Sequence, residues 1–259
     1  MPFISSTTSA YGYGRNAVLN DIYFNKTVLL LHMNRLGGTG GGEPVFNDFF
    51  IDSSLYYKFV APNGLVSLST AQYRFGNASA FFDNTTAYLT VDHDDTLNFS
   101  TGDWTIELFC RIDPIETDIL INKSIGLGFF GYQLRIVNNR FSAKGYGLED
   151  PLLPKLVYEL GEDVGPTVIP NTWYHVVVAR QLSNFYLYVN GTLVDSAISS
   201  KPLYNSTGPL SIGGTSNGQG LTSGYIDELR ITKGVCRYPN GQTFLVPASQ
   251  FFDNSVIDN

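Results

Sequence analysis

Carboxylates are the side chains through which this sequence could carry out acid–base chemistry, and Asp227-Glu228 is the nearest approach to a catalytic pair. Side chains at positions i and i+2 of a β-strand share a face, whereas those at i and i+1 point to opposite faces. We therefore expect Asp227 and Glu228 on opposite faces of one strand. A glycosidase needs two carboxyl groups about 5–9.5 Å apart across one bond. Glu107 has no partner at a suitable strand spacing either, so the sequence predicts a protein that is not an enzyme.

The other reactive side chains form no catalytic motif. The glycine-rich segment 37–42 lacks the Lys-Ser/Thr that follows the glycines of a phosphate-binding loop. Cys110 and Cys236 fit neither a metal-site spacing nor a disulfide framework, and we expect both to be reduced. The histidines are scattered through different predicted elements, where packing or a satisfied hydrogen bond explains them: His32, His93 and His175.

One acidic run, Asp92-His93-Asp94-Asp95, has the oxygen ligands that calcium prefers. The same run is also typical of a solvated loop after a strand. The sequence leaves both interpretations open.

Composition limits the class of protein and its partners. Only 15% of the residues are charged, against about 25% in an average soluble domain, so Ser, Thr and Asn must keep the surface hydrated. Together with 26 Gly, 16 Tyr and 18 Phe, they favour strands and turns and exclude a helical bundle. The formal charge of −7 argues against a nucleic-acid partner. We also expect no membrane insertion, because no apolar run approaches the roughly 20 residues of a spanning helix.

Short β signals separated by turn residues fill the chain from residue 27 onward. In the predicted strand 104–112, alternation assigns Trp104 and Leu108 to a core face and Glu107 to the opposite face. So many short antiparallel strands must stack as two sheets. The predicted strands are 27–34, 79–82, 87–92, 104–112, 119–122, 132–137, 141–146, 155–160, 173–180, 185–189, 192–197, 210–213 and 225–232.

Four stretches resemble, in order, the laminin G-like branch of the concanavalin A-like lectin/glucanase jelly rolls. They are STAQYRFG at 69–76, running on through SAFFD at 79–83 to YL at 88–89; GDWTIE at 102–107; WYHVVV at 173–178 with LYVNG at 187–191; and GYIDELRI at 224–231. The resemblance implies an all-β, two-sheet antiparallel jelly-roll sandwich. The predicted organisation is an extended N-terminal arm at 1–26, which is docking or disordered, a jelly roll at 27–253 and a C-terminal tail at 254–259.

Two flanking pieces are similar to the version of this module found in bacteriophage structural proteins: LLLHMN at 29–34 and TKGVCRY at 232–238. The chain departs from the family pattern in the insertion at 37–42, in Cys110 where Trp is common, and in Asn84 where Gly usually follows Asp83. These changes leave the fold expectation intact but put local ligand contacts in doubt.

The resemblance also implies what the site could hold. The glucanase relatives carry an E-x-D-x-x-E strand, which this chain lacks. Laminin G-like jelly rolls often hold a structural calcium ion, and Asp83 and Asp227 are the candidate metal ligands by this analogy. No other cofactor is expected.

The leading hypothesis is a non-enzymatic phage virion structural protein. It would be made in the host cytoplasm, mounted on a capsid or tail through its arm, oligomeric within the particle, and would display an outward surface for adhesion. The alternative is a carbohydrate-binding adhesin that recognises host-surface glycans, and a glycan hydrolase is the weakest hypothesis. The candidate sugar-stacking side chains are tyrosines that we expect to be exposed: Tyr146, Tyr186, Tyr188 and Tyr204.

Overall fold

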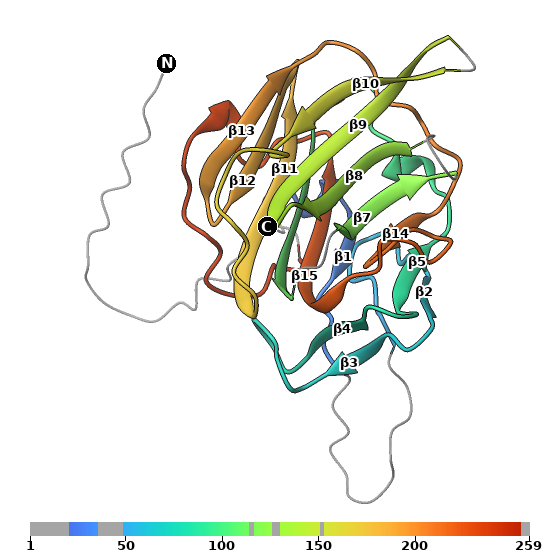
Figure 1. Ribbon diagram of the computed structural model, residues 1–259, viewed down its shortest axis with the longest axis vertical. Helices are drawn as coiled ribbons and strands as arrows, with labels where there is room; N and C mark the ends of the chain where they lie inside the picture. The colour runs from blue at the N-terminus through green and yellow to red at the C-terminus, as the bar shows by residue number, and fades with distance from the viewer. Residues whose placement is uncertain (1–20, 36–48, 114–116, 126–129, 151–152, 255–259) are drawn as a thin grey trace, which may run out of the picture.

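The computed structural model describes residues 21–35, 49–113, 117–125, 130–150 and 153–254, and these form two stacked antiparallel sheets (Figure 1). We call the sheet nearer the viewer in Figure 1 the front sheet and the other the back sheet. Short 3₁₀ turns are the only helices in the described ranges: η1 (Phe24–Lys26), η2 (Asp95–Leu97) and η3 (Pro239–Gly241). None of them has the length or apolar character needed to cross a membrane. The expected all-β sandwich is confirmed.

The back sheet contains eight strands. Its order is β13 (Thr192–Ile198), β12 (Asn184–Val189), β11 (Thr172–Gln181), β6 (Trp104–Ile112), β15 (Ser223–Lys233), β4 (Ser79–Asp83) and β3 (Ser67–Ser69), with β1 (Thr27–Leu31) also paired to β15.

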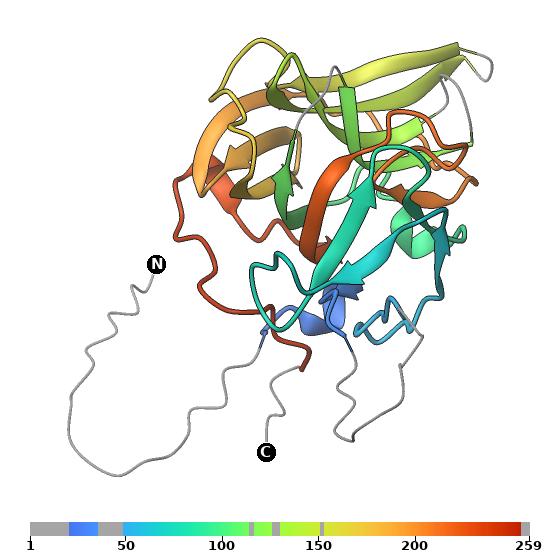
Figure 2. The ribbon, with the colours of Figure 1, turned by 60° about the horizontal axis from the view of Figure 1, so that its bottom comes forward.

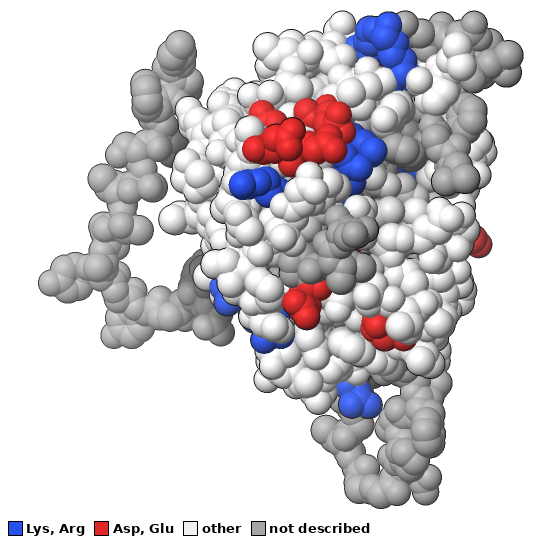
Figure 3. Space-filling view, viewed as in Figure 1, with Lys and Arg blue, Asp and Glu red and all other residues white. Residues whose placement is uncertain are grey.

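The front sheet contains seven strands. Its order is β10 (Leu153–Leu160), β9 (Arg140–Asp150), β8 (Phe130–Val137), β7 (Thr117–Ser124), β14 (Leu210–Ile212), β5 (Tyr88–Val91) and β2 (Val60–Asn63). Figure 3 looks onto its outer face, where charged side chains gather in a few places on an otherwise uncharged surface.

Alternating apolar side chains from both sheets meet in one core. In β6, Trp104, Ile106 and Leu108 point inward and are almost fully buried, as the sequence predicted. Trp104 stacks on Phe99 with 4.9 Å between ring centroids, and Phe99 stacks in turn on Tyr132 of β8 at 4.8 Å. Aromatic contacts therefore join the two sheets across the sandwich.

β15 changes partners halfway along one edge. Its first half pairs with β4 and its second half with β1, while β6 pairs with the other edge throughout. A β-bulge interrupts the pairing with β6 between Asp227 and Arg230, and Glu228 adopts a left-handed backbone with φ +48°. The bulge lies where one neighbouring strand ends and the other begins.

The last described segment, residues 234–254, crosses the outer face of the back sheet, and we call it the C-terminal strap. Figure 2 shows the blue first residues of the body beside the red end of the strap. The Asp21 N–H donates to the Asn254 carbonyl at 3.2 Å, so the two ends of the described body lie side by side. Residues 21–26 of the expected arm pack against the body, whereas residues 1–20 and 255–259 lie outside the described ranges.

Candidate functional site

A row of polar side chains crosses the outer face of the front sheet, and we call it the polar row. Each member pairs directly with the next across neighbouring strands and alternates with core residues on its own strand. The row runs Thr90, Ser211, Asn122, Gln133, Lys144 and Glu159, from β5 to β10. The sequence shows each of these polar residues within a strand, but the register that aligns them depends on bulges in β7 and β10.

The middle of the polar row is nearly buried, while its end on β10 reaches solvent. Gln133 Nε2 donates to Asn122 Oδ1 at 3.2 Å, so the two central amides satisfy each other. Lys144 lies beside Tyr146, with its ammonium nitrogen 6.0 Å from the ring centroid. The β9–β10 end of the row therefore presents a cation and a carboxylate, with the Tyr146 ring beside them, and such groups can orient a polar ligand.

Charges gather where the row reaches β10. Arg135 Nη2 lies 3.2 Å from Glu159 Oε1 and 3.5 Å from Glu162 Oε1. Burial, together with a hydrogen bond and repulsion from Glu162, raises the pKa of Glu159. The two carboxyl groups contact each other, and they are therefore too close for the 5–9.5 Å spacing of a glycosidase pair.

The outer face of the back sheet is different because the C-terminal strap covers it. Phe251 packs with Phe24, Leu30 and Phe109 in one apolar cluster. A second cluster joins Tyr186 and Tyr188 to strap residues that include Tyr238 and Phe244. This face therefore forms a second, thin core outside the sandwich.

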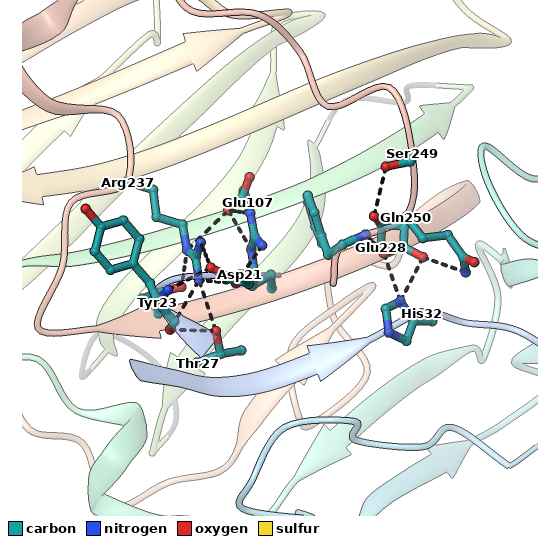
Figure 4. A network of polar contacts seen from close by, with 12 residues as sticks. Asp21, Tyr23, Thr27, His32, Glu107, Glu228, Arg237, Ser249 and Gln250 are labelled. Carbon is teal, nitrogen blue, oxygen red and sulfur yellow. Dashed lines mark hydrogen bonds and ion pairs between the residues drawn. The ribbon is translucent and has the colours of Figure 1, made fainter. Parts of the chain in front are cut away.

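Buried ion pairs fasten the first residues of the body to this face (Figure 4). Arg237 approaches both carboxylate oxygens of Asp21, at 2.9 and 2.7 Å. Arg230 Nη1 lies 3.1 Å from Asp21 Oδ2, and Arg230 Nη2 lies 2.8 Å from Glu107 Oε1. Two arginines from β15 and the strap thus hold carboxylates from the N-terminal segment and from β6.

Glu107 is completely buried in this network. Its second oxygen accepts from the Tyr238 hydroxyl at 2.7 Å and lies 3.2 Å from His175 Nε2. Burial alone would raise the pKa of Glu107, but Arg230, His175 and Arg237 together hold it well below its usual range. The lowered pKa keeps Glu107 ionised, and its hydrogen bonds join β6 to the strap. A buried carboxylate with a lowered pKa is unsuited to proton transfer.

Asp227 and Glu228 both lie on this outer face, so the prediction of opposite faces was wrong. The bulge rotates Glu228 to the side occupied by His32, whose Nδ1 lies 2.9 Å from both Glu228 oxygens. Glu228 also accepts from the backbone N–H of Phe251 at 2.9 Å and from Gln250 Nε2 at 3.1 Å. Regular alternation fails at an inserted residue, and a single sequence does not reveal the bulge.

Glu228 fastens the far end of the strap. Burial opposes protonation of His32, but the hydrogen bond and charge of Glu228 raise its pKa overall. Neighbouring Asp227 accepts the backbone N–H groups of Arg74 and Phe75 at 2.7 and 3.0 Å. Burial raises the pKa of Asp227 to about 7, helped by the charge of Glu228 and opposed by those two hydrogen bonds. Both carboxyl groups are completely buried beneath other segments of the chain. They therefore form a structural pair that a substrate does not reach.

The candidate calcium ligands accept hydrogen bonds from the chain itself, Asp83 from its own turn and Asp227 from the distant backbone of Arg74 and Phe75. Among the described residues, none donates a hydrogen bond to Asp227 Oδ1. Asp83 accepts from the backbone or hydroxyl groups of Thr85 and Thr86 and from the Ala87 N–H, and these donors outweigh burial and lower its pKa. Asp83 and Asp227 bind different loops. Within the described ranges, no three His, Cys, Asp or Glu side chains gather as a group able to hold a metal ion. The calcium site stays a prediction.

The acidic run at 92–95 caps a turn. Asp94 accepts from the Thr96 N–H at 2.8 Å at the start of η2, and it pairs with Lys58 at 3.1 Å. Asp95 lies 3.5 Å from His93 Nε2.

Two of the four tyrosine candidates are buried, contrary to the expectation that they are exposed. Tyr186 and Tyr188 lie under the strap, and the Tyr188 hydroxyl donates to the Tyr238 carbonyl at 2.9 Å. Tyr146 and Tyr204 keep partial exposure near the front sheet, where the Tyr204 N–H donates to the Tyr146 carbonyl. The sequence could not distinguish the two pairs because the strap is remote from β12 in the chain.

The fold and its polar outer face define a lectin-like jelly-roll sandwich. Residues 83–236, more than half of the chain, match the family model Laminin_G_3, described as the concanavalin A-like lectin/glucanases superfamily. The chain belongs to this superfamily, as the sequence motifs predicted. No curated protein matches the sequence significantly.

Solved structures with the same fold include clostridial binding domains. The binding domain of Paraclostridial Mosquitocidal Protein 1 superposes with a TM-score of 0.62 at 15% identity, over 83% of this chain and 51% of that one. A structure of botulinum neurotoxin type C, whose cell entry depends on interaction with two ganglioside molecules, superposes with a TM-score of 0.58 at 14% identity, over 83% of this chain and 49% of that one. The botulinum neurotoxin DC binding domain, solved with rat synaptotagmin II, has a TM-score of 0.57 at 13% identity, over 83% of this chain and 50% of that one. This chain spans about half the length of these proteins.

Proposed function

We propose that this protein is a non-enzymatic adhesion module of a phage virion, mounted on capsid or tail proteins through its N-terminal end. The observation that carries the proposal is that the outer faces of the two sheets differ. The back face is sealed by the strap and lies where both ends of the body meet. The front face carries the polar row.

The buried ion pairs support the mounting role. Asp21, the first described residue, is held by Arg230 and Arg237 from β15 and the strap. The first described residue is therefore anchored to the back sheet. Arg237, which holds Asp21, belongs to the flanking motif at 232–238, whereas His32, from the motif at 29–34, pairs with Glu228 near the end of the strap.

Incorporation into particles tests the mount. A chain lacking residues 1–20 keeps Asp21 and Phe24, so we expect an unchanged melting temperature but no incorporation into assembled particles. A front-face variant, Lys144→Ala in the full chain, is the matched control and should incorporate normally. Normal incorporation of the shortened chain would refute the role of the N-terminal end.

A carbohydrate-binding adhesin is the second candidate, and it is compatible with the first. The polar row favours it, and botulinum neurotoxin type C, which contains this fold, depends on gangliosides for cell entry. The glycan would lie across the β9–β10 end of the row, where Lys144 and Glu159 offer hydrogen bonds and Tyr146 a ring.

Glycan arrays and host-envelope binding test this candidate. Tyr146→Ala should weaken glycan binding by about ten-fold, the loss expected for roughly 1.4 kcal/mol. Tyr73→Ala is the matched control, because Tyr73 is an exposed tyrosine in the loop between β3 and β4 of the back sheet. Equal binding by both variants, or no glycan binding by the full chain, would leave only the structural role.

Two narrower proposals complete the function. A structural calcium ion held by Asp83 or Asp227 predicts a melting temperature that falls when a chelator is added, and an unchanged midpoint contradicts it. Absence of catalysis predicts no turnover of cell-wall polysaccharide, and turnover that disappears in Glu159→Gln would restore the hydrolase hypothesis.

A further inference from the structure

A mainly aromatic surface lies along one side of the sandwich, between β1 of the back sheet and β2 of the front sheet. We call it the aromatic edge. Its members are Phe49, Ile51, Tyr56, Tyr57 and Phe59, with exposed fractions of 53, 47, 44, 77 and 76%. A groove of about 530 Å³ opens at this edge. It is lined by Phe49, Ile51, Tyr57 and Phe59, by Phe50, Val60 and Pro62, and by the two charged residues Asp52 and Lys58.

The loop that carries the aromatic edge is rigidly held. Asp52 is buried, and its two oxygens accept from the backbone N–H groups of Leu30, Ser54 and Lys58 at 3.0, 2.9 and 2.8 Å. Ile51 and Phe59 face each other in an antiparallel bridge. Tyr57 adopts a left-handed backbone with φ +48° at the tip. The exposed rings are therefore preorganised, and a partner would not have to order them on binding.

Few polar groups in the groove are available to a ligand. The Asp52 carboxylate is used by the loop itself, and the Lys58 ammonium pairs with Asp94 at 3.1 Å and lies 4.6 Å from the Tyr56 ring centroid. A glycan needs several hydrogen-bonding groups besides a ring, whereas the buried centre of a protein interface is aromatic and depleted of charge. The chemistry of the aromatic edge favours a protein surface over a sugar.

The area is sufficient for a specific contact between two proteins. At about 200 Å² for a whole aromatic side chain, the exposed parts of the four rings sum to about 500 Å². Two such surfaces facing each other would remove about 1,000 Å² from water, the lower bound for a specific interface.

Area and shape point to a second copy of this chain as the occupant. Tyr57 and Phe59 form part of the wall of the groove and stay 77 and 76% exposed, so across a two-fold axis the rings of each copy can pack into the groove of the other. Such an arrangement is isologous, with residue i contacting j and j contacting i. The two charged groups of the groove are already engaged, Asp52 by backbone N–H groups and Lys58 by Asp94, so they add little repulsion between two copies that each carry a net charge of −7.

We propose that the aromatic edge is a two-fold homodimer interface. In the dimer, Phe59 and Tyr57 of each copy fill the groove beside Phe49 and Ile51 of the other. The proposal stands independently of the virion role, because it concerns the full chain in solution.

Sedimentation velocity of the full chain over a wide concentration range tests the interface. We expect a reversible monomer–dimer equilibrium that is lost in Phe59→Ser and in Tyr57→Ser, with unchanged melting temperatures because both side chains are largely exposed. Leu245→Ser is the matched control, since Leu245 is 95% exposed on the strap, and it should dimerise like the wild type.

Three results would overturn the proposal. They are a wild-type chain that stays monomeric at every concentration, a dimer that survives both Phe59→Ser and Tyr57→Ser, and growth beyond the dimer into open-ended assemblies. Glycan binding abolished by Phe59→Ser in a monomeric chain would reassign the edge to a sugar.

Discussion

The outer faces of the two sheets contrast sharply in how they treat polar side chains. On the back face, Glu107 and Asp21 are buried and neutralised by Arg230 and Arg237 beneath the strap. On the front face, Arg135 is nearly buried, but its partners Glu159 and Glu162 at the rim of the polar row keep contact with water. The same alternation places polar residues outward in both sheets. On the back sheet the strap covers them, so they form structural ion pairs, whereas on the front sheet the β10 end of the polar row stays accessible to ligands.

The contrast predicts that the largest loss of stability comes from breaking the back-face network. Arg230→Met removes the main cation beside buried Glu107, and we expect the free energy of unfolding to fall by about 3–5 kcal/mol. On the front face, Arg135→Met should cost about 1 kcal/mol or less, because its partners are partly exposed. Chemical denaturation of both variants measures the difference, and equal losses would erase the distinction between the faces.

Removing the apolar seal of the strap should cause the next largest loss of stability at a fixed pH. Phe251→Ala opens the cluster of Phe24, Leu30 and Phe109, and we expect a loss of about 3 kcal/mol. Hydrogen exchange should show reduced protection of two backbone amides. They are the amide of Phe251 and that of Asp21, which donates to the Asn254 carbonyl. The exposed control Leu245→Ala should change stability by less than about 0.5 kcal/mol. Unchanged protection of the strap amides in Phe251→Ala would mean that Glu228 alone holds the strap in place.

The back face should also govern a pH dependence. Asp227 has a pKa raised by burial to about 7, above the unfolded value of about 3.9. The folded state therefore binds more protons between these values, and this group's contribution makes stability fall as pH rises from about 4 to about 7. Asp227→Asn should flatten that slope, an effect on the order of 4 kcal/mol across the window. An identical slope in the variant contradicts the raised pKa.

The smallest effect is expected at the centre of the polar row. Gln133→Ala removes the donor to Asn122 and should lower the free energy of unfolding by about 1 kcal/mol. Thr90→Ala, at the end of the row, removes the partly exposed hydrogen bond from Asn63 Nδ2 to the Thr90 hydroxyl and is expected to cost less than Gln133→Ala. A loss as large as that of Arg230→Met would show that the front face is also a structural core.

Much of the fold was predictable from local patterns. Alternation in β6 identified its core face correctly, and each predicted range overlaps an observed strand, because each apolar run ends near a turn residue. Most observed strands extend a residue or more beyond the predicted range, and the short strands β2 and β3 were not predicted. The candidate site was less predictable. Glu107 was assigned correctly away from the sandwich core, but its burial depends on residues 234–254, which return over β6 from far along the chain.

The sequence by itself determined an all-β sandwich of this superfamily, because side-chain alternation and turn chemistry act over a few residues. Only the tertiary structure decided which outward residues meet. Strand register aligned Thr90 to Glu159 into one row, the bulge at Glu228 turned two adjacent carboxylates to the same face, and the strap buried Tyr186 and Tyr188. These outcomes depend on contacts between segments distant in the chain, where a shift of one residue reverses the face that a side chain occupies.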